Sequence, residues 1–227
     1  MSIDVTDLNR FYNSVMGTEV SRILSGALKK CLNPEKIKTL SIGYGFPYDD
    51  ESLMVHAALE HFGVLQEHGQ THATTLIDEE RFPFKDESFD NCFLIHALEH
   101  AQHQKFFLRE VWRILKPNGK VIVVLPNRRG LWARFDNNPF GMGQPYTKEQ
   151  AFALLRDNLL EPLFHERALF HPPFFPFFKS YFYAESVLSW IFAKFSGVII
   201  IEAEKRVYCP VIKGKRQMVM NPGFVSE

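Results

Sequence analysis

Three residues that can carry out acid–base chemistry lie within one short run, at His96, Glu99 and His100. The run directly follows the apolar stretch 92–95, which has the composition of a buried strand. Open α/β sheets bind their ligands at the carboxyl ends of their strands, so this position favours a functional role. An imidazole can take a proton from a hydroxyl or an amine near neutral pH. His96 and His100 are therefore candidate catalytic bases, although a structural role near a helix start explains His100 at least as well.

The same three residues spell His-x-x-Glu-His, which is also the pattern of the inverted zinc peptidases. Such a site needs both histidines one turn apart on one helix face and a third ligand further along the chain. His96 instead follows a predicted strand. We therefore predict no metal, and a zinc metallohydrolase using His96, Glu99 and His100 is the least favoured of three functional hypotheses.

A second candidate site is the turn that contains Gly43 and Gly45, after the strand-like stretch 38–43. Glycine lets a backbone turn sharply and approach a ligand without a side-chain clash, so strand ends beneath nucleotides often use it. Two glycines alone are also what an ordinary turn contains. Whether Gly43 and Gly45 form a ligand-binding turn therefore has to be judged from the sequence that follows them.

Hydrophobic patterning indicates the elements that must position these residues. The stretches 91–95 and 121–125 are short and almost wholly apolar, as in parallel strands covered on both faces. Between them, residues 104–115 carry one apolar stripe with a helical period, and the turn at 116–119 ends that helix. Further strands are expected at 38–43, 62–67, 71–78, 163–170 and 198–208, and further helices at 5–12, 18–31, 50–60, 147–158 and 181–195.

Composition limits the class of protein. A chain of 227 residues with 46% hydrophobic residues fits one α/β domain with a filled core. Its formal net charge of zero gives no global field for nucleic acid, so we expect no nucleic-acid partner. Three cysteines without metal or redox spacing, and an acidic start unlike a signal peptide, favour a cytoplasmic protein. No run approaches the roughly 18 apolar residues that span a bilayer, so we expect no transmembrane segment.

A series of short motifs follows in fixed order through residues 82–127. They are Phe82-Pro83-Phe84, Ser88-Phe89-Asp90, Ala97-Leu98-Glu99-His100, Leu108 with Glu110, Arg113-Ile114-Leu115-Lys116-Pro117-Asn118-Gly119 and Pro126-Asn127. The series resembles the central pattern of the class I S-adenosylmethionine-dependent methyltransferases, in particular the ubiquinone and menaquinone biosynthesis methyltransferase-like group (methyltransferase type 11). The resemblance implies an α/β, Rossmann-like fold, with a seven-stranded, mostly parallel sheet, helices on both faces and an antiparallel last strand.

The resemblance also implies where the methionine part of the cofactor S-adenosylmethionine would bind. Gly43 and Gly45 occupy the place of the family's acidic-x-Gly-x-Gly-x-Gly loop, and His96 borders the same end of the ligand. The chain departs from the family at Ser41, which replaces the acidic residue, and at Pro47, which replaces the third glycine.

Three carboxylates are the corresponding candidates for the nucleoside part. Glu67 is the nearest candidate for the acidic residue that closes the second strand and holds the ribose hydroxyls, although it is equally well explained as a solvated loop residue. Asp78, with Glu79 beside it, would accept a hydrogen bond from the adenine amino group. The alternative for Asp78 is an ordinary turn aspartate at a strand end.

The loop at 127–146 is basic and is the expected acceptor site. Arg128 and Arg129 offer forked donors for carboxylate or phosphate, while Trp132 and Tyr146 offer flat apolar surface. In the alternative interpretation, the arginines pair with the chain's own carboxylates and the aromatic rings only fix the loop.

We divide the chain into an N-terminal helical cover at 1–36, a methyltransferase-like domain at 37–209 and a tail at 210–227. The segment 170–195 is dense in aromatic residues, and we expect it to pack as a lid over the sheet. A hydrophobic substrate pocket, a dimer face and a peripheral membrane contact stay open for it, so the chain is expected to be a monomer or a homodimer.

Three functions result, in order of preference. The first is methyl transfer from S-adenosylmethionine to a small lipophilic or anionic acceptor by in-line displacement, with the protein supplying mainly proximity and orientation. The second keeps the fold without catalysis, as a module that senses the cofactor or binds a protein, because Ser41 and Pro47 weaken the cofactor loop. The third is the zinc metallohydrolase.

Overall fold

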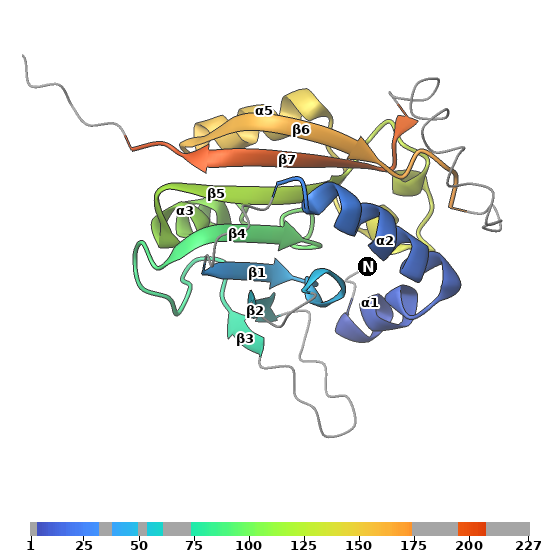
Figure 1. Ribbon diagram of the computed structural model, residues 1–227, viewed down its shortest axis with the longest axis horizontal. Helices are drawn as coiled ribbons and strands as arrows, with labels where there is room; N and C mark the ends of the chain where they lie inside the picture. Colours follow the sequence, from blue (N-terminus) through green and yellow to red (C-terminus); the bar gives the residue numbers. More distant parts are fainter. Residues whose placement is uncertain (1–3, 32–37, 50–53, 61–73, 174–194, 208–227) are drawn as a thin grey trace, which may run out of the picture.

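Seven strands form a single sheet in the computed structural model, which describes residues 4–31, 38–49, 54–60, 74–173 and 195–207 (Figure 1). The strands are β1 (Thr39–Gly43), β2 (Met54–Leu59), β3 (Thr74–Ile77), β4 (Phe89–Ile95), β5 (Leu115–Pro126), β6 (Leu160–Ala168) and β7 (Val198–Lys205). Their order is β3-β2-β1-β4-β5-β7-β6. The first five are parallel, and β7 runs antiparallel to both β5 and β6. The predicted mostly parallel sheet with an antiparallel last strand is confirmed.

The described helices are α1 (Val5–Tyr12), α2 (Val15–Leu28), α3 (Gln104–Ile114), α4 (Pro139–Met142) and α5 (Lys148–Asp157), with short 3-10 turns η1 (Phe46–Tyr48) and η3 (Trp132–Arg134). Four of the described α-helices, α1, α2, α4 and α5, begin after a polar side chain that caps them. Asp4 and Ser14 cap the first two helices, and Thr147 forms a reciprocal capping box with Gln150 at α5. Figure 1 shows α1 and α2 at the end of the sheet to which the arrows of β1 and β4 point. The N-terminal helices thus lie at the carboxyl ends of the parallel strands.

The unit β4–α3–β5 forms as its patterning predicts. The α3 side chains of Phe107, Val111 and Ile114 are fully buried, on one side of the helix. Asn118 then takes a left-handed backbone, with φ of 60°, in the turn that leads into the buried part of β5.

One predicted helix is wrong. We expected a helix at 50–60, but Met54–Leu59 is a strand that pairs in parallel with β1, with Ile42 opposite Ala57. A short apolar run cannot be assigned to helix or strand by periodicity alone, and Ala57, Ala58 and Leu59 are all buried as in a strand covered on both faces. The strand expected at 62–67 and almost all of the helix expected at 181–195 lie outside the described residues.

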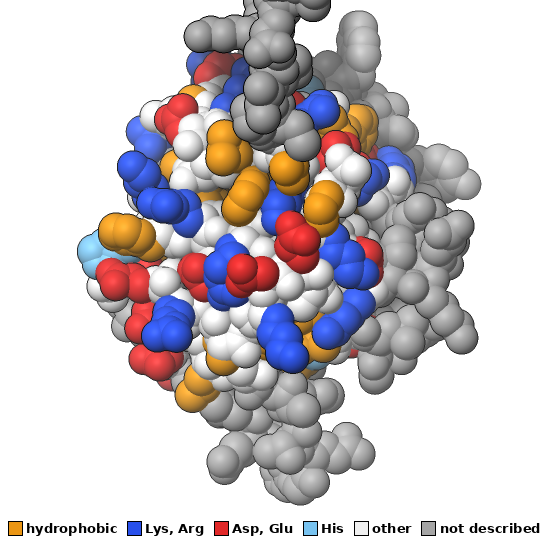
Figure 2. Space-filling model, turned by 90° about the vertical axis from the view of Figure 1, so that its left-hand side faces the viewer, with side chains coloured by type: hydrophobic (Ala, Val, Ile, Leu, Met, Phe, Trp, Pro, Cys, Tyr) orange, Lys and Arg blue, Asp and Glu red, His pale blue; other side chains and the backbone are white. Residues whose placement is uncertain are grey.

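The surface carries charges of both signs. On the face in Figure 2, at the amino ends of β1 and β4, basic and acidic side chains are interspersed. Within the part of the chain that the structure describes, no helix combines the length and the apolar character needed to cross a bilayer.

Candidate functional site

The turn after β1 is fixed by close backbone contacts. Gly43 has φ of +98°, and a Cβ atom added to it would lie 2.1 Å from the carbonyl oxygen of Ile95 in β4. The next amide, of Tyr44, donates to that same oxygen at 2.8 Å. Gly45 lies against Ser41, whose Oγ would be 1.8 Å from an added Cβ. The predicted sharp turn is confirmed, and a side chain fits at neither glycine.

Three buried tyrosines pack beside this turn. The rings of Tyr12 and Tyr44 are stacked, with centroids 5.3 Å apart and an interplanar angle of 16°. The hydroxyls of Tyr48 and Tyr12 form a hydrogen bond of 3.1 Å. Burial raises the pKa of Tyr12 and of Tyr48 well above its usual value, so both side chains are neutral phenols. A residue of α1 therefore closes over the carboxyl end of β1.

His96 ends β4 in a strained backbone conformation. Its φ is +54°, which few residues other than glycine adopt, and only 1% of its surface is exposed. Its Nε2 atom is 2.8 Å from the hydroxyl of Tyr12, and its Nδ1 atom is 3.3 Å from Oε1 of Glu99. The ring also lies against Phe140, at a centroid distance of 4.8 Å.

The structure brings His96, Glu99 and His100 together. One possible ligand atom from each of them lies within 4.8 Å of the other two. The strand before His96 is present as expected, yet the left-handed backbone turns its imidazole toward Glu99. The main chain of Glu99 is held from the other side, since its carbonyl accepts a hydrogen bond of 2.8 Å from the amide of Gln144. Glu99 is buried and His100 is half-buried.

Asp78 and Glu79 follow β3 and support the local chain. Oδ1 of Asp78, which is exposed, accepts a 2.9 Å hydrogen bond from the amide of Glu80. The two carboxylate oxygens of Glu79 accept from the amides of Gln102 and His103, at 3.0 and 2.8 Å. Glu79 therefore ties the start of α3 to the end of β3, while Asp78 lies at the surface in a turn.

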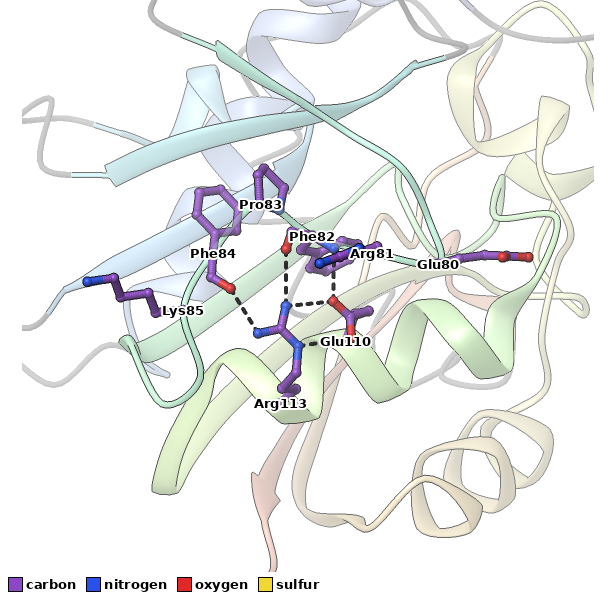
Figure 3. Close-up of a pocket in the computed structure, with 8 residues that line it drawn as sticks. All are labelled: Glu80, Arg81, Phe82, Pro83, Phe84, Lys85, Glu110 and Arg113. Carbon is purple, nitrogen blue, oxygen red and sulfur yellow. Dashed lines mark hydrogen bonds and ion pairs between the residues drawn. The ribbon is translucent and has the colours of Figure 1, made fainter.

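An arginine clasp holds the loop that follows (Figure 3). Arg113 of α3 donates to the carbonyl oxygens of Phe82 and Phe84, at 3.1 and 2.8 Å, and to both oxygens of Glu110. Glu110 in turn accepts from the amide of Phe82 at 2.8 Å. Burial opposes ionisation of Glu110, but the hydrogen bonds from Arg113 hold its pKa below the usual value. A cavity of about 650 Å³ lies beside the clasp. The polar groups of Arg113 and Glu110 that line it are already hydrogen-bonded to each other and to the 82–84 backbone.

A carboxylate that sequence analysis missed lies at the end of β2. The proposed ribose ligand Glu67 is outside the described residues. Since β2 ends at Leu59, the exposed Glu60 is the residue that directly follows the second strand. Leu59 pairs with Ile77 in β3, so Glu60 and Asp78 leave neighbouring strands side by side. Glu60 is recognised as a candidate ribose ligand only because β2 is observed to end at Leu59. The sequence alone did not locate that strand.

The four predicted acceptor residues lie in different surroundings. The guanidinium of Arg128 donates to the carbonyl of Pro145, and Arg129 is exposed. Trp132 is fully buried and donates to the carbonyl of His171 at 2.7 Å. Tyr146 is buried and its hydroxyl hydrogen-bonds the side chain of Gln104. Two of these side chains support the loop, and the acceptor role of the set stays a prediction.

Comparison with known proteins agrees with this geometry. Residues 48–123 match the methyltransferase domain of the type 11 family. A stretch of 46 residues is 41% identical to the demethylmenaquinone methyltransferase of Streptomyces griseus, and covers 20% of each chain. The matched stretches span about a fifth of the length of the curated relatives.

Solved structures share the fold at low sequence identity. A possible histamine N-methyltransferase of Thermotoga maritima superimposes with a TM-score of 0.62 and 18% identity, over 89% of this chain and 96% of that one. The cyclase SpnF gives a TM-score of 0.56 at 18% identity, over 86% and 85% of the two chains. The fold is therefore the Rossmann-like fold of class I S-adenosylmethionine-dependent methyltransferases. Within that fold, residues 48–123 are similar to the methyltransferase type 11 domain.

Proposed function

We propose that the chain binds S-adenosylmethionine at the carboxyl ends of its parallel strands and transfers the methyl group to a small molecule. One observation carries the proposal: Gly43, Glu60 and Asp78 come at the ends of three neighbouring strands. Ligands of open α/β sheets bind at this edge. Both carboxylates lie within the stretch that matches the methyltransferase domain.

Each residue has a defined part in this proposal. The backbone at Gly43 and Gly45 lies against the methionine end of the ligand, where no side chain of the turn interferes. The carboxylate of Glu60 accepts from the two ribose hydroxyls, and Asp78 accepts from the adenine amino group. The Glu60 assignment replaces Glu67 because of where β2 ends. These contacts hold the sulfonium in line with the acceptor, and positioning of this kind supplies most of the rate enhancement.

His96 and His100 are the candidate bases for an oxygen or nitrogen acceptor. His96 is oriented by Tyr12, whereas His100 is partly exposed and lies at the rim. An acceptor with a lipophilic or anionic group fits the basic and aromatic loop at 127–146, where Arg129 is exposed.

Calorimetric titration with S-adenosylmethionine and its demethylated product tests the proposal. Losing a carboxylate that accepts from the ligand costs about 1.5–3 kcal/mol, or roughly ten- to a hundredfold in affinity. Glu60→Gln and Asp78→Asn should each show this loss. Asparagine keeps the acceptor for the Glu80 amide, so the turn survives while the second acceptor is replaced by a donor. Glu80→Gln, an exposed neighbour, is the control and should bind normally. No binding by the natural sequence at millimolar ligand would contradict the proposal.

A second function, ligand or protein binding without methyl transfer, is favoured by a separate observation. Tyr12, Tyr44 and Tyr48 are packed over the end of β1, and Ser41 replaces the family's acidic residue. The likeness to SpnF, whose name is that of a cyclase, supports the view that this fold alone does not fix a reaction. Tight binding of the demethylated product without turnover of any acceptor would favour this second function.

A further inference from the structure

Glu99 is a buried carboxylate whose charge the surrounding hydrogen bonds do not balance. Only 4% of its surface is exposed, and among the described residues no donor hydrogen-bonds either of its side-chain oxygens. The Nδ1 atom of His96, which faces it, likewise has no hydrogen bond to any residue that the structure describes. Burying an unpaired carboxylate costs several kcal/mol, so such groups pair with a cation or bind a metal.

Tyr12 can accept a hydrogen bond from the ring of His96. The hydroxyl of Tyr48 donates to the hydroxyl of Tyr12 at 3.1 Å, and a phenol oxygen can accept a second hydrogen bond. The 2.8 Å contact between Nε2 of His96 and the hydroxyl of Tyr12 therefore fits His96 as the donor, the tautomer in which its Nδ1 atom carries a lone pair.

In that tautomer the lone pair of Nδ1 faces Oε1 of Glu99 at 3.3 Å. A lone pair that faces a carboxylate oxygen is repulsive, and a cation between the two atoms removes the repulsion. Two ligands of a tetrahedral zinc ion at about 2.0–2.1 Å lie roughly 3.3–3.4 Å apart, so these two atoms have a spacing that suits a zinc ion.

We propose that His96, Glu99 and His100 bind one divalent transition-metal ion of the zinc type, with Tyr12 as the residue that orients His96. Two imidazoles and one carboxylate are a donor set that zinc accepts, with a fourth position open to water or to an acceptor oxygen. A metal-bound histidine commonly donates its second N–H to a fixed acceptor, and the hydroxyl of Tyr12 lies 2.8 Å from Nε2 of His96 to accept it. The half-buried His100 gives the ion a path from the surface.

Cation binding at this site does not depend on the proposed methyl transfer. It does change the roles within it, because an imidazole that ligates a metal is not available as a base. A bound ion would lower the pKa of an acceptor hydroxyl at the open position, which could then release its proton to solvent water. A hydrolase activity is no part of the proposal.

The test is zinc binding by the full chain after treatment with a chelator. Dialysis against micromolar Zn(II), followed by elemental analysis, should give about one equivalent of zinc per chain. Glu99→Gln, which keeps the shape of the side chain, and His96→Asn, which tolerates the left-handed backbone, should each bind at least tenfold more weakly. His103→Ala is the control, because that exposed histidine lies outside the cluster, and it should keep its full equivalent.

Two further variants separate loss of zinc binding from loss of folding. Tyr12→Phe should keep the far-ultraviolet circular dichroism of the natural protein and lose about ten- to a hundredfold in zinc affinity, which a purely structural tyrosine would not cause. If the buried variants fail to fold, the partly exposed His100→Ala decides. Binding well below one equivalent, or equal binding by Glu99→Gln and the natural sequence, would overturn the metal site. Titration with S-adenosylmethionine in the absence of metal then shows whether the proposed function stands without it.

Discussion

Two neighbouring pairs of parallel strands in this sheet are connected in contrasting ways. β4 and β5 are joined through α3, which packs against them with its own apolar stripe. β1 and β2 are joined by residues 44–53, whose described part contains only the short turn η1. The β4–β5 unit thus carries its own cover, whereas the end of β1 is covered by α1, from the start of the chain. Where the described part of a crossover contains no α-helix, distant residues cover the strand end, as Tyr12 does beside His96.

The largest expected effect on stability is in the β4–α3–β5 unit. Phe107→Ala removes a fully buried ring between α3 and the sheet. Such truncations cost about 3–5 kcal/mol because a cavity is left behind. Urea unfolding followed by circular dichroism should show this loss with an unchanged slope. Phe106→Ala is the matched control, since the neighbouring Phe106 is 48% exposed, and it should cost less than about 1 kcal/mol.

The next effect is at the turn between β1 and β2. Gly43→Ala forces a side chain into a backbone with φ of +98° and against the Ile95 carbonyl, so we expect a loss of about 2–4 kcal/mol. The same substitution at Gly26 in α2 meets no atom within 4 Å and should stabilise by up to about 1 kcal/mol. Thermal unfolding of the two variants compares them directly. Equal stability of both would show that the β1 turn is not held as described.

An intermediate effect is expected at the arginine clasp. Arg113→Lys loses the two-pronged contact with Glu110 and the bonds to the 82–84 backbone, for about 2 kcal/mol. The exposed Arg109→Lys is the control. The pKa of Glu110 is lowered in the folded state, so its contribution to stability is present above the usual carboxyl pKa and is lost as pH falls. The difference between Arg113→Lys and the natural protein should therefore narrow in acid, as a pH series of unfolding curves would show.

Local patterning was sufficient for most of the fold. The stripe of α3 and the capping residue Thr147 each place an element within a residue or two of where it lies. The run 54–59 was assigned to a helix, since a short and mostly apolar run fits both periods, and its pairing with β1 makes it a strand. Tertiary contact, which a single sequence does not display, decided this element.

The site was predictable only where it follows strand ends. His96 directly follows β4 and Gly43 is the last residue of β1, and the sequence predicts both of these strands. The contact of His96 with Tyr12 joins residues 84 positions apart, and no local pattern in the sequence signals it. Glu60 was missed for a related reason, since a shift in the position of one strand changes which carboxylate ends it.

The smallest expected effect measures how firmly α1 is held over β1. Tyr48→Phe removes one hydroxyl from the chain between Ser21 and Tyr12, and such a bond is worth about 0.5–1.5 kcal/mol net. Tyr12→Phe removes the next one, and the two changes share a partner, so their effects should not add. A double-mutant cycle by urea unfolding should give a coupling of about 0.5–1 kcal/mol between them. Additive losses would mean that the hydroxyls act separately, and that packing of the tyrosine rings alone holds α1 over the sheet.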